Sequence, residues 1–284
     1  MGDVIFNNVR QCGHAKAVFQ MFLNLFQVTG SNKGVGFAVV RALCKSYHGD
    51  VFLTSRGVGR GQAAIADLNK EGLQPKFHQL DINDRSSVDQ LKSFLQTTYG
   101  GLDVLVNNAG IAYKKAHPAP FSERAEVTCK TNFWATLDVC RVLFPLLRPH
   151  ASIPPCHSTI TECSTAVQGR FKDPSLTMNG LEKIMQKFVD CALLCAVLSR
   201  QVNTRTMDSQ TRRASCPRSG SFIQDREIRK DSREDIVINT CCSGSVTTDM
   251  SSHQGTKTID EGEQFCRTYS ETPGCDVVCV PVQV

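Results

Sequence analysis

The stretch TGSNKGVG, residues 29–36, decides the fold of this chain. An apolar run, AVFQMFLNLFQV, precedes it at 17–28, and apolar side chains at helical spacing follow it. In a glycine turn between a strand and a helix, a phosphate can rest on the helix N-terminus, where free N–H groups and the helix dipole favour negative charge. The stretch therefore predicts a dinucleotide-binding turn. Gly30 permits the turn, Gly34 lets the backbone approach the pyrophosphate, and Gly36 lets helix and strand pack closely.

Strands and helices alternate from this turn onward. The apolar patterns predict strands at 23–28, 50–55, 76–80 and 102–106, and helices at 33–44, 62–70, 86–98 and 126–147. The segment LDVLV at 102–106 is apolar almost throughout, which is typical of a strand covered on both faces. This alternation predicts an α/β fold, with a Rossmann-type doubly wound parallel sheet in a single domain, 21–284.

The regularity of the pattern changes along the chain. We expect 21–148 to be well specified and 149–235 to be atypical. Within the atypical part, 201–235 is polar and rich in Arg and Ser, so we predict a loop or disorder there. Residues 1–20 show no clear periodicity and predict a loose N-terminal extension.

After residue 150 the regular apolar pattern returns only in short segments, so we expect a C-terminal half in which the fold is degraded, with elements of the sheet missing. Apolar spacing predicts a helix at 181–198 and a strand at 236–239. Pro154 and Pro155 stand where a central strand should lie, and proline cannot donate to a strand ladder. We therefore predict that this central strand is lost, together with the helix packed on it.

Composition excludes several classes of function. A net charge of +5 over 284 residues is too small to favour nucleic acid, although it suits an anionic, phosphate-bearing ligand. The 14 Cys residues contain no CxxC pair, so no metal site is expected. We expect buried free thiols in a reduced, cytoplasmic chain instead. The apolar run at 17–28 is too short to span a membrane. It also lacks a cleavage site, so neither a signal peptide nor a membrane partner is expected.

The end of the second predicted strand, TSR at 54–56, indicates the choice of coenzyme. An acidic side chain at this position would bind the ribose 2′-hydroxyl and repel a 2′-phosphate. Here Arg56 follows the strand, and Lys33 in the glycine turn offers a second cation. Because arginine can bind a phosphate through two parallel hydrogen bonds, the pair predicts NADPH rather than NADH. The alternative is two solvated surface cations.

Longer motifs carry a family resemblance. These are TGSNKGVG at 29–36, GDVFLTSRGVGRGQAA at 49–64, KFHQLDIND at 76–84, GGLDVLVNNAGIAYK at 100–114, KTNFWATLDVC at 130–140 and INTCCSGSVTTDM at 238–250. With them the chain resembles the short-chain dehydrogenases/reductases, and among these the NADPH-dependent carbonyl reductases of mammals. The resemblance is dense over 28–148 and returns only in the last motif. It implies reduction of small aldehydes, ketones or quinones by a cytoplasmic monomer.

The resemblance also implies roles for individual residues. Cofactor contacts are implied for Gly30, Asn32, Lys33, Gly34, Val35, Gly36, Arg56, Asp81, Ile82, Asn108, Thr247 and Thr248. Asp81 and Ile82 would lie at the adenine, and Asn108 near the ribose. Substrate-side contacts are implied for Tyr113, Lys114 and Cys242. Asn132 would be the remnant of a proton relay, in which it holds a water.

The catalytic residues of the family are missing from their places. In the family a Ser polarises the carbonyl, and a Tyr one helical turn ahead of a Lys donates the proton, because the Lys cation favours the phenolate. None of the four tyrosines, Tyr47, Tyr99, Tyr113 and Tyr269, has Lys at the fourth position after it. Ser158 and Tyr113 remain as weak catalytic candidates.

Three interpretations stay open. The chain is an NADPH-dependent reductase, a catalytically inactive NADPH-binding pseudoenzyme, or an aberrant product without a stable fold. The resemblance ends abruptly after residue 148, which suggests that one block was replaced through altered splicing, a change of reading frame or a mistaken gene model.

Overall fold

The computed structural model describes residues 25–114, 117–153, 169–171, 173, 175–201, 237–238 and 243–268. The predicted extension at 1–20 lies outside these ranges, as does the predicted loop from residue 202 onward. Two predicted site residues, Ser158 and Cys242, also lie outside the described residues.

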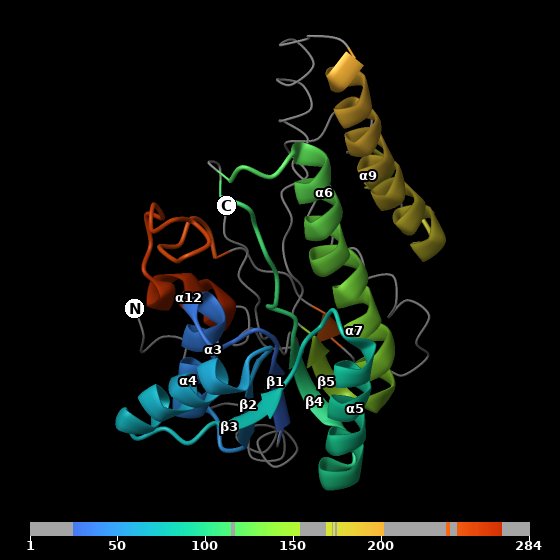
Figure 1. Cartoon of the computed structure of the whole chain (residues 1–284). Helices are drawn as coiled ribbons and strands as arrows, with labels where there is room; N and C mark the ends of the chain where they lie inside the picture. Colours follow the sequence, from blue (N-terminus) through green and yellow to red (C-terminus); the bar gives the residue numbers. More distant parts are fainter. Residues whose placement is uncertain are drawn as a thin grey trace.

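A parallel sheet forms the centre of the described structure (Figure 1). Its strands are β1 (Leu25–Val28), β2 (Asp50–Ser55), β3 (Lys76–Gln79), β4 (Leu102–Val106), β5 (Leu147–Ile153) and β6 (Val237–Ile238). They lie in the order β3-β2-β1-β4-β5-β6, and each neighbouring pair is parallel. The strand order reverses between β1 and β4, and in open α/β sheets ligands bind outside the carboxyl ends of the strands at such a point. The predicted doubly wound fold is therefore confirmed.

Helices cover both faces of the sheet. They are α3 (Gly34–Ser46), α4 (Val58–Lys70), α5 (Arg85–Tyr99), α6 (Phe121–Cys129), α7 (Thr136–Leu143), α9 (Met178–Gln201) and α12 (Ile259–Thr268). Figure 1 shows α3, α4 and α12 on one side of the sheet and α5, α6 and α7 on the other. No helix within the described ranges has the length and apolar character that a membrane crossing requires.

Alternation along the strands divides the interior into two cores. In β1, Leu25 packs into the core that contains α5 and α7, while Phe26 packs into the core that contains α3 and α4. Successive side chains of a strand point to opposite faces, so both faces of this buried strand need apolar side chains. Burial on both faces is why β1 and β4 form nearly continuous apolar runs, each interrupted by one buried polar residue, Gln27 or Asp103.

The helix predicted at 126–147 has different ends and an interruption. It begins earlier, at Phe121, and a π-helical turn, η2 (Lys130–Ala135), separates α6 from α7. After α7 the short 3-10 helix η3 (Phe144–Leu146) leads directly into β5, so Pro149 lies inside a strand and does not end the helix. A π-helical turn widens the helix locally and is frequent at functional sites.

The prediction that a central strand is lost is wrong. Strand β5 occupies that position and pairs with both β4 and β6. It lies earlier in the sequence than expected and ends at Ile153, immediately before the two prolines. The register between β4 and β5 shifts after Leu147, and Pro149 lies in this irregular part, where a missing donor is tolerated.

The helix predicted at 181–198 is confirmed as α9, which begins at Met178. It packs against α6, and its side chains Leu181 and Met185 are fully buried in the core that contains α5 and α7, whereas Leu193 and Leu194 are exposed. A helix packed into this core therefore follows β5 in the chain.

Candidate functional site

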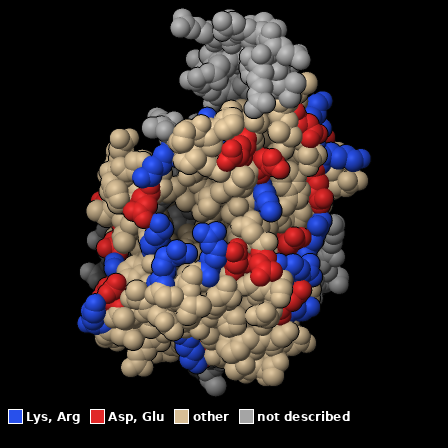
Figure 2. Space-filling view, in the orientation of Figure 1, with Lys and Arg blue, Asp and Glu red and all other residues tan. Residues whose placement is uncertain are grey.

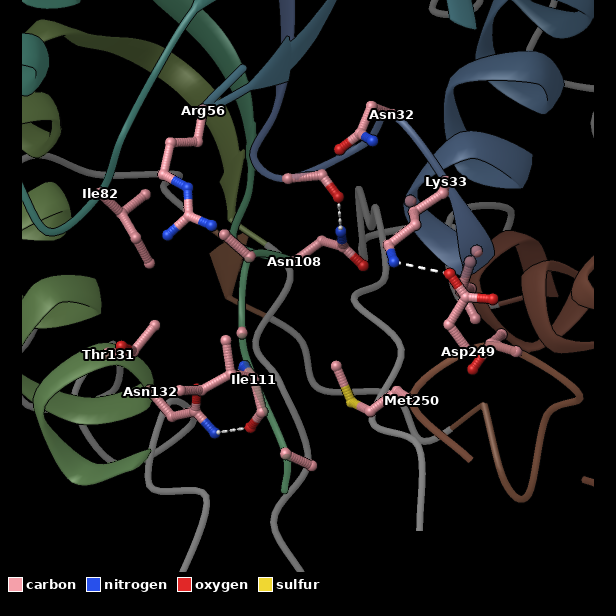
Figure 3. A pocket seen from close by; sticks show the side chains of 18 of the residues that line it. Asn32, Lys33, Arg56, Ile82, Asn108, Ile111, Thr131, Asn132, Asp249 and Met250 are labelled. Carbon is pink, nitrogen blue, oxygen red and sulfur yellow. Dashed lines mark hydrogen bonds and ion pairs between the residues drawn. The ribbon is translucent and has the colours of Figure 1, made fainter. Parts of the chain in front are cut away.

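A pocket of about 730 Å³ lies where the strand order reverses (Figure 3). Its walls come from the glycine turn after β1, the turn after β2, the residues after β3 and β4, η2, and the segment 247–253. Figure 2 shows Lys and Arg side chains gathered around a hollow on this face, and Lys33, Arg56, Arg60 and Lys114 are among the residues that line the pocket. A cleft of this size suits a small-molecule cofactor.

The glycine turn has the geometry that its sequence predicts. Gly30 and Gly34 both have φ of 61°, in the left-handed region that favours glycine. A Cβ added to Gly30 would lie 2.8 Å from Cα of Ala109, so the turn is pressed against the chain that follows β4. Helix α3 then begins with no side-chain cap and no acidic residue in its first turn, which suits an anion at its N-terminus.

Asn108 joins the glycine turn to the end of β4. Its Nδ2 donates to the carbonyl oxygens of Thr29 and Gly30, both at 2.9 Å. In return, Thr29 Oγ1 accepts hydrogen bonds of 2.9 Å from the backbone N–H groups of Asn108 and Ala109. The sequence predicts that Gly36 lets helix and strand pack closely. In the structure, a Cβ at Gly36 would lie 2.3 Å from Nδ2 of Asn108, so the glycine makes room for this side chain and not for a strand.

Two arginines line the pocket beyond β2. Arg56 follows the strand, as predicted, and Arg60 stands four positions later in the first turn of α4. Among the described residues neither guanidinium makes an ion pair with a carboxylate. Arg60 was missed because the helix was expected to begin at Gln62. It begins at Val58, so Arg60 lies in its first turn, whereas Arg56 precedes the helix.

Lys33 has a partner that the sequence did not suggest. Its Nζ lies 2.6 Å from Asp249 Oδ2, and Oδ1 of the same carboxylate lies 3.1 Å from His253 Nε2. The hydrogen bond from Lys33, aided by its charge, holds the pKa of the Asp249 carboxyl below its usual range. The two residues are 216 positions apart, so no local pattern indicates their contact.

The predicted adenine contacts line the pocket after β3. The backbone N–H of Asp81 donates to Ser87 Oγ at 3.0 Å, and Asp81 Oδ1 accepts from the backbone N–H of Asn83 at 3.0 Å. Ile82 is buried beside them. These bonds hold the turn after β3 in one shape at the wall of the pocket.

Asn132 lies in the π-helical turn, directly beside Ile111 in the wall of the pocket (Figure 3). Its Oδ1 accepts from the backbone N–H of Ile111, and its Nδ2 donates to the carbonyl oxygen of Ile111, both at 2.8 Å. The side chain thereby holds the segment after β4 against η2.

The segment after β6 closes one side of the pocket. Thr247 donates from its backbone N–H to Lys257 O and from Oγ1 to Gly255 O, both at 2.7 Å. Thr248 is buried, and Thr247, Thr248 and Met250 all line the pocket. The predicted cofactor residues from both ends of the chain thus meet in one cleft.

Comparisons with known proteins agree with this geometry. A family model for short chain dehydrogenases matches residues 24–160. Carbonyl reductase [NADPH] 3 of Rattus norvegicus is 42% identical over 256 residues, covering 84% of this chain and 87% of that protein. The chain belongs to the short-chain dehydrogenase family. Carbonyl reductase [NADPH] 1 of Homo sapiens is also 42% identical, over 254 residues with the same coverage. The predicted likeness to carbonyl reductases is confirmed.

A solved structure has the same fold. Salutaridine reductase from Papaver somniferum superposes with a TM-score of 0.71 at 24% identity, covering 88% of this chain and 96% of that one. At this identity the likeness concerns the fold alone. It shows that the overall fold of this short-chain dehydrogenase is shared with that structure.

The substrate side of this short-chain dehydrogenase differs from the prediction in one respect. Ala112 and Lys114 line the pocket, but the ring of Tyr113 between them packs edge-on against His117, with centroids 4.7 Å apart. Tyr113 is thus not among the residues that line the pocket. Within the described residues, no group of three His, Cys, Asp or Glu is placed to bind a metal.

Proposed function

We propose that this chain binds NADPH in the pocket and is by lineage an oxidoreductase that reduces small aldehydes, ketones or quinones. The observation that carries the proposal is the pair Arg56 and Arg60, which line the pocket where an acidic residue would select NADH. Two guanidinium groups that line one pocket can bind a 2′-phosphate from two directions. The names of the relatives, carbonyl reductase [NADPH], support the same coenzyme and the same class of substrate.

The residues present fit the coenzyme without rearrangement of the sheet. The left-handed Gly30 and Gly34 bring the backbone close to a pyrophosphate, and the uncapped N-terminus of α3 favours its charge. Asp81 and Ile82 stand at the wall where an adenine would lie. When bound, NADPH supplies the hydride, and this chain positions it against a carbonyl carbon.

The chemical step is proposed to be slow. No tyrosine of the chain has a lysine at the fourth position after it, so the proton donor of the family is absent from its place. Loss of a positioned general acid costs about 10²–10⁴-fold in rate. A catalytically inactive NADPH-binding protein is therefore the second candidate function, and this absent pair is the observation that favours it.

Purified protein should be tested for NADPH oxidation by absorbance, with a reactive quinone as acceptor. A double variant, Arg56→Ala with Arg60→Ala, is the control, because it removes both guanidinium groups from the pocket. Turnover that falls in the control supports the reductase. Coenzyme binding without turnover supports the inactive NADPH-binding protein. A sample that is unfolded by circular dichroism would overturn both candidates and favour the aberrant product.

A cytoplasmic monomer and a single domain over 21–284 are part of the same proposal. Among the described residues, the large apolar side chains that are exposed are Val58, Leu193 and Leu194. Such isolated residues form no wide apolar patch of the kind that marks a permanent interface. Sedimentation equilibrium tests the monomer directly.

A further inference from the structure

The ion pair between Lys33 and Asp249 crosses the mouth of the pocket (Figure 3). Lys33 is the N-cap residue of α3, which is where the phosphate of a bound dinucleotide would rest. Its side chain turns toward Asp249, and the ammonium lies 2.6 Å from the carboxylate. The lysine of the glycine turn is therefore paired with a carboxylate in this structure.

The carboxylate is held in place by the loop that carries it. Ser251 Oγ donates to Val246 O at 2.8 Å, and the backbone N–H of His253 donates to Thr248 O at 2.8 Å. Ser252 and His253 both have positive φ, 55° and 60°, which is uncommon for residues other than glycine. These bonds fold the loop back on itself and present Asp249 to Lys33.

Both members of the pair are accessible to solvent, with 65% of the Lys33 side chain and 57% of the Asp249 side chain exposed. An exposed ion pair contributes little to stability, so an incoming anion can replace it. The pyrophosphate of a dinucleotide carries two negative charges, one on each phosphate, and offers the ammonium more acceptor oxygens than one carboxylate does. Asp249 would also repel that pyrophosphate directly while it remains at the mouth.

We propose that Asp249 is an internal competitor that holds Lys33 in the free protein and so weakens binding of the dinucleotide phosphates. The inference rests on the proposed function, because it concerns the same pocket. Binding of the dinucleotide exchanges the carboxylate for a phosphate at Lys33. The exchange lowers the affinity for the coenzyme and speeds its release. Asp249 is thus a positioning residue that acts through Lys33.

Removal of the competing charge provides the test. Asp249→Asn should bind NADPH about three- to fivefold more tightly than the unchanged protein at low ionic strength, measured by nucleotide fluorescence. Asp249→Glu keeps the charge and should bind with unchanged affinity. In a Lys33→Ala background, Asp249→Asn should lose most of its effect, because the cation under competition is absent.

A matched control separates this competition from a change in net charge. Asp260 is an exposed carboxylate that pairs with Arg41 at 2.7 Å outside the pocket, so Asp260→Asn removes the same charge from a similar ion pair. It should change NADPH affinity by less than about twofold. Equal tightening by both substitutions, or no tightening by Asp249→Asn, would overturn the proposal.

Inorganic pyrophosphate, titrated by calorimetry against the same variants, separates this inference from the proposed function. If the protein binds pyrophosphate with the expected order of affinities but does not bind NADPH, the proposed function fails and the competition stands. If it binds NADPH, and Asp249→Asn changes the affinity for neither ligand, the competition fails and the function stands. Binding of neither ligand overturns both.

Discussion

A Cβ added to Gly36 would lie 2.3 Å from Nδ2 of Asn108, the atom that joins the glycine turn to the end of β4. The close approach of α3 therefore leaves no space at Gly36 for a side chain beside the amide that ties the glycine turn to the end of β4.

Gly36→Ala should displace the Asn108 amide and disrupt both of its bonds to the turn. We expect a loss of about 2 kcal/mol in the free energy of unfolding, as for other overpacked sites, and NADPH binding weakened by about tenfold or more. Urea denaturation and nucleotide fluorescence measure the two effects.

Gly59→Ala is the control, because a Cβ there meets nothing within 4 Å. It should stabilise α4 by up to about 1 kcal/mol. Similar losses in both variants would contradict this account.

Tyr113→Phe should leave any NADPH oxidation by this chain nearly unchanged. The ring of Tyr113 packs against His117 and is not among the residues that line the pocket, so its hydroxyl is not placed to donate a proton to a carbonyl there. We expect a change of less than about twofold in kcat, whereas loss of a working general acid costs about 10²-fold or more. A drop of that size, measured with the quinone acceptor, would show that Tyr113 turns into the pocket during the reaction.

Arg148→Ala should destabilise the fold strongly. Arg148 Nη1 lies 2.5 Å from Oδ2 of Asp103, whose side chain is only 4% exposed, and Nη2 donates to the carbonyl oxygen of Tyr99. Removal of the guanidinium leaves a buried carboxylate without this cation, which should cost about 2–4 kcal/mol in the free energy of unfolding. Arg85→Ala breaks an exposed pair with Asp89 on α5 and should cost no more than about 0.5 kcal/mol. Equal midpoints in urea would count against this role of Arg148.

Alkylation should distinguish Cys44 from Cys191. Burial raises the pKa of the Cys44 thiol from its ordinary value of 9.0 to about 11, whereas Cys191 is exposed. At pH 8.5, iodoacetamide should therefore modify Cys191 at least about tenfold faster than Cys44, because the thiolate is the reactive form. Peptide mass spectrometry after short exposures gives both rates, and equal rates would contradict the burial of Cys44.

The same shift predicts a change of stability with pH. The folded pKa of Cys44 lies above its unfolded value, so the half-buried neutral thiol contributes stability that is fully present below pH 9.0 and is lost as the pH rises toward about 11. Cys44→Ala should flatten the stability profile in this range. If the stability of Cys44→Ala falls with pH as steeply as that of the unchanged protein, Cys44 is not the source of the change.

The strands with the clearest apolar patterns were predicted to the residue. Both β2 (Asp50–Ser55) and β4 (Leu102–Val106) have the predicted bounds. Burial on both faces favours apolar side chains along most of a strand, and this preference is visible in a short stretch of sequence. Strand β5 was missed because its position depends on pairing with β4 and β6, and its segment contains Pro149.

The site residues also divide into those that a local pattern predicts and those that it does not. Arg56 was predicted because its position after β2 is set by the strand itself. Arg60 was missed because the first turn of α4 contains two glycines and no clear start signal, so the helix seemed to begin later. For Ser158 and Cys242 the predicted roles stay predictions, because both lie outside the described residues.

The sequence by itself determined the glycine turn, the α/β alternation and the cationic end of β2, because each depends on the conformational freedom, polarity or charge of residues close together in the chain. Only the tertiary structure decided that Asn108 fills the space beside Gly36, that β5 completes the sheet, and that Asp249 meets Lys33 across 216 positions. These contacts join segments that the crossovers of the sheet bring together. The strength of these contacts depends on distances between atoms in space, and such distances cannot be obtained from the local pattern of the sequence.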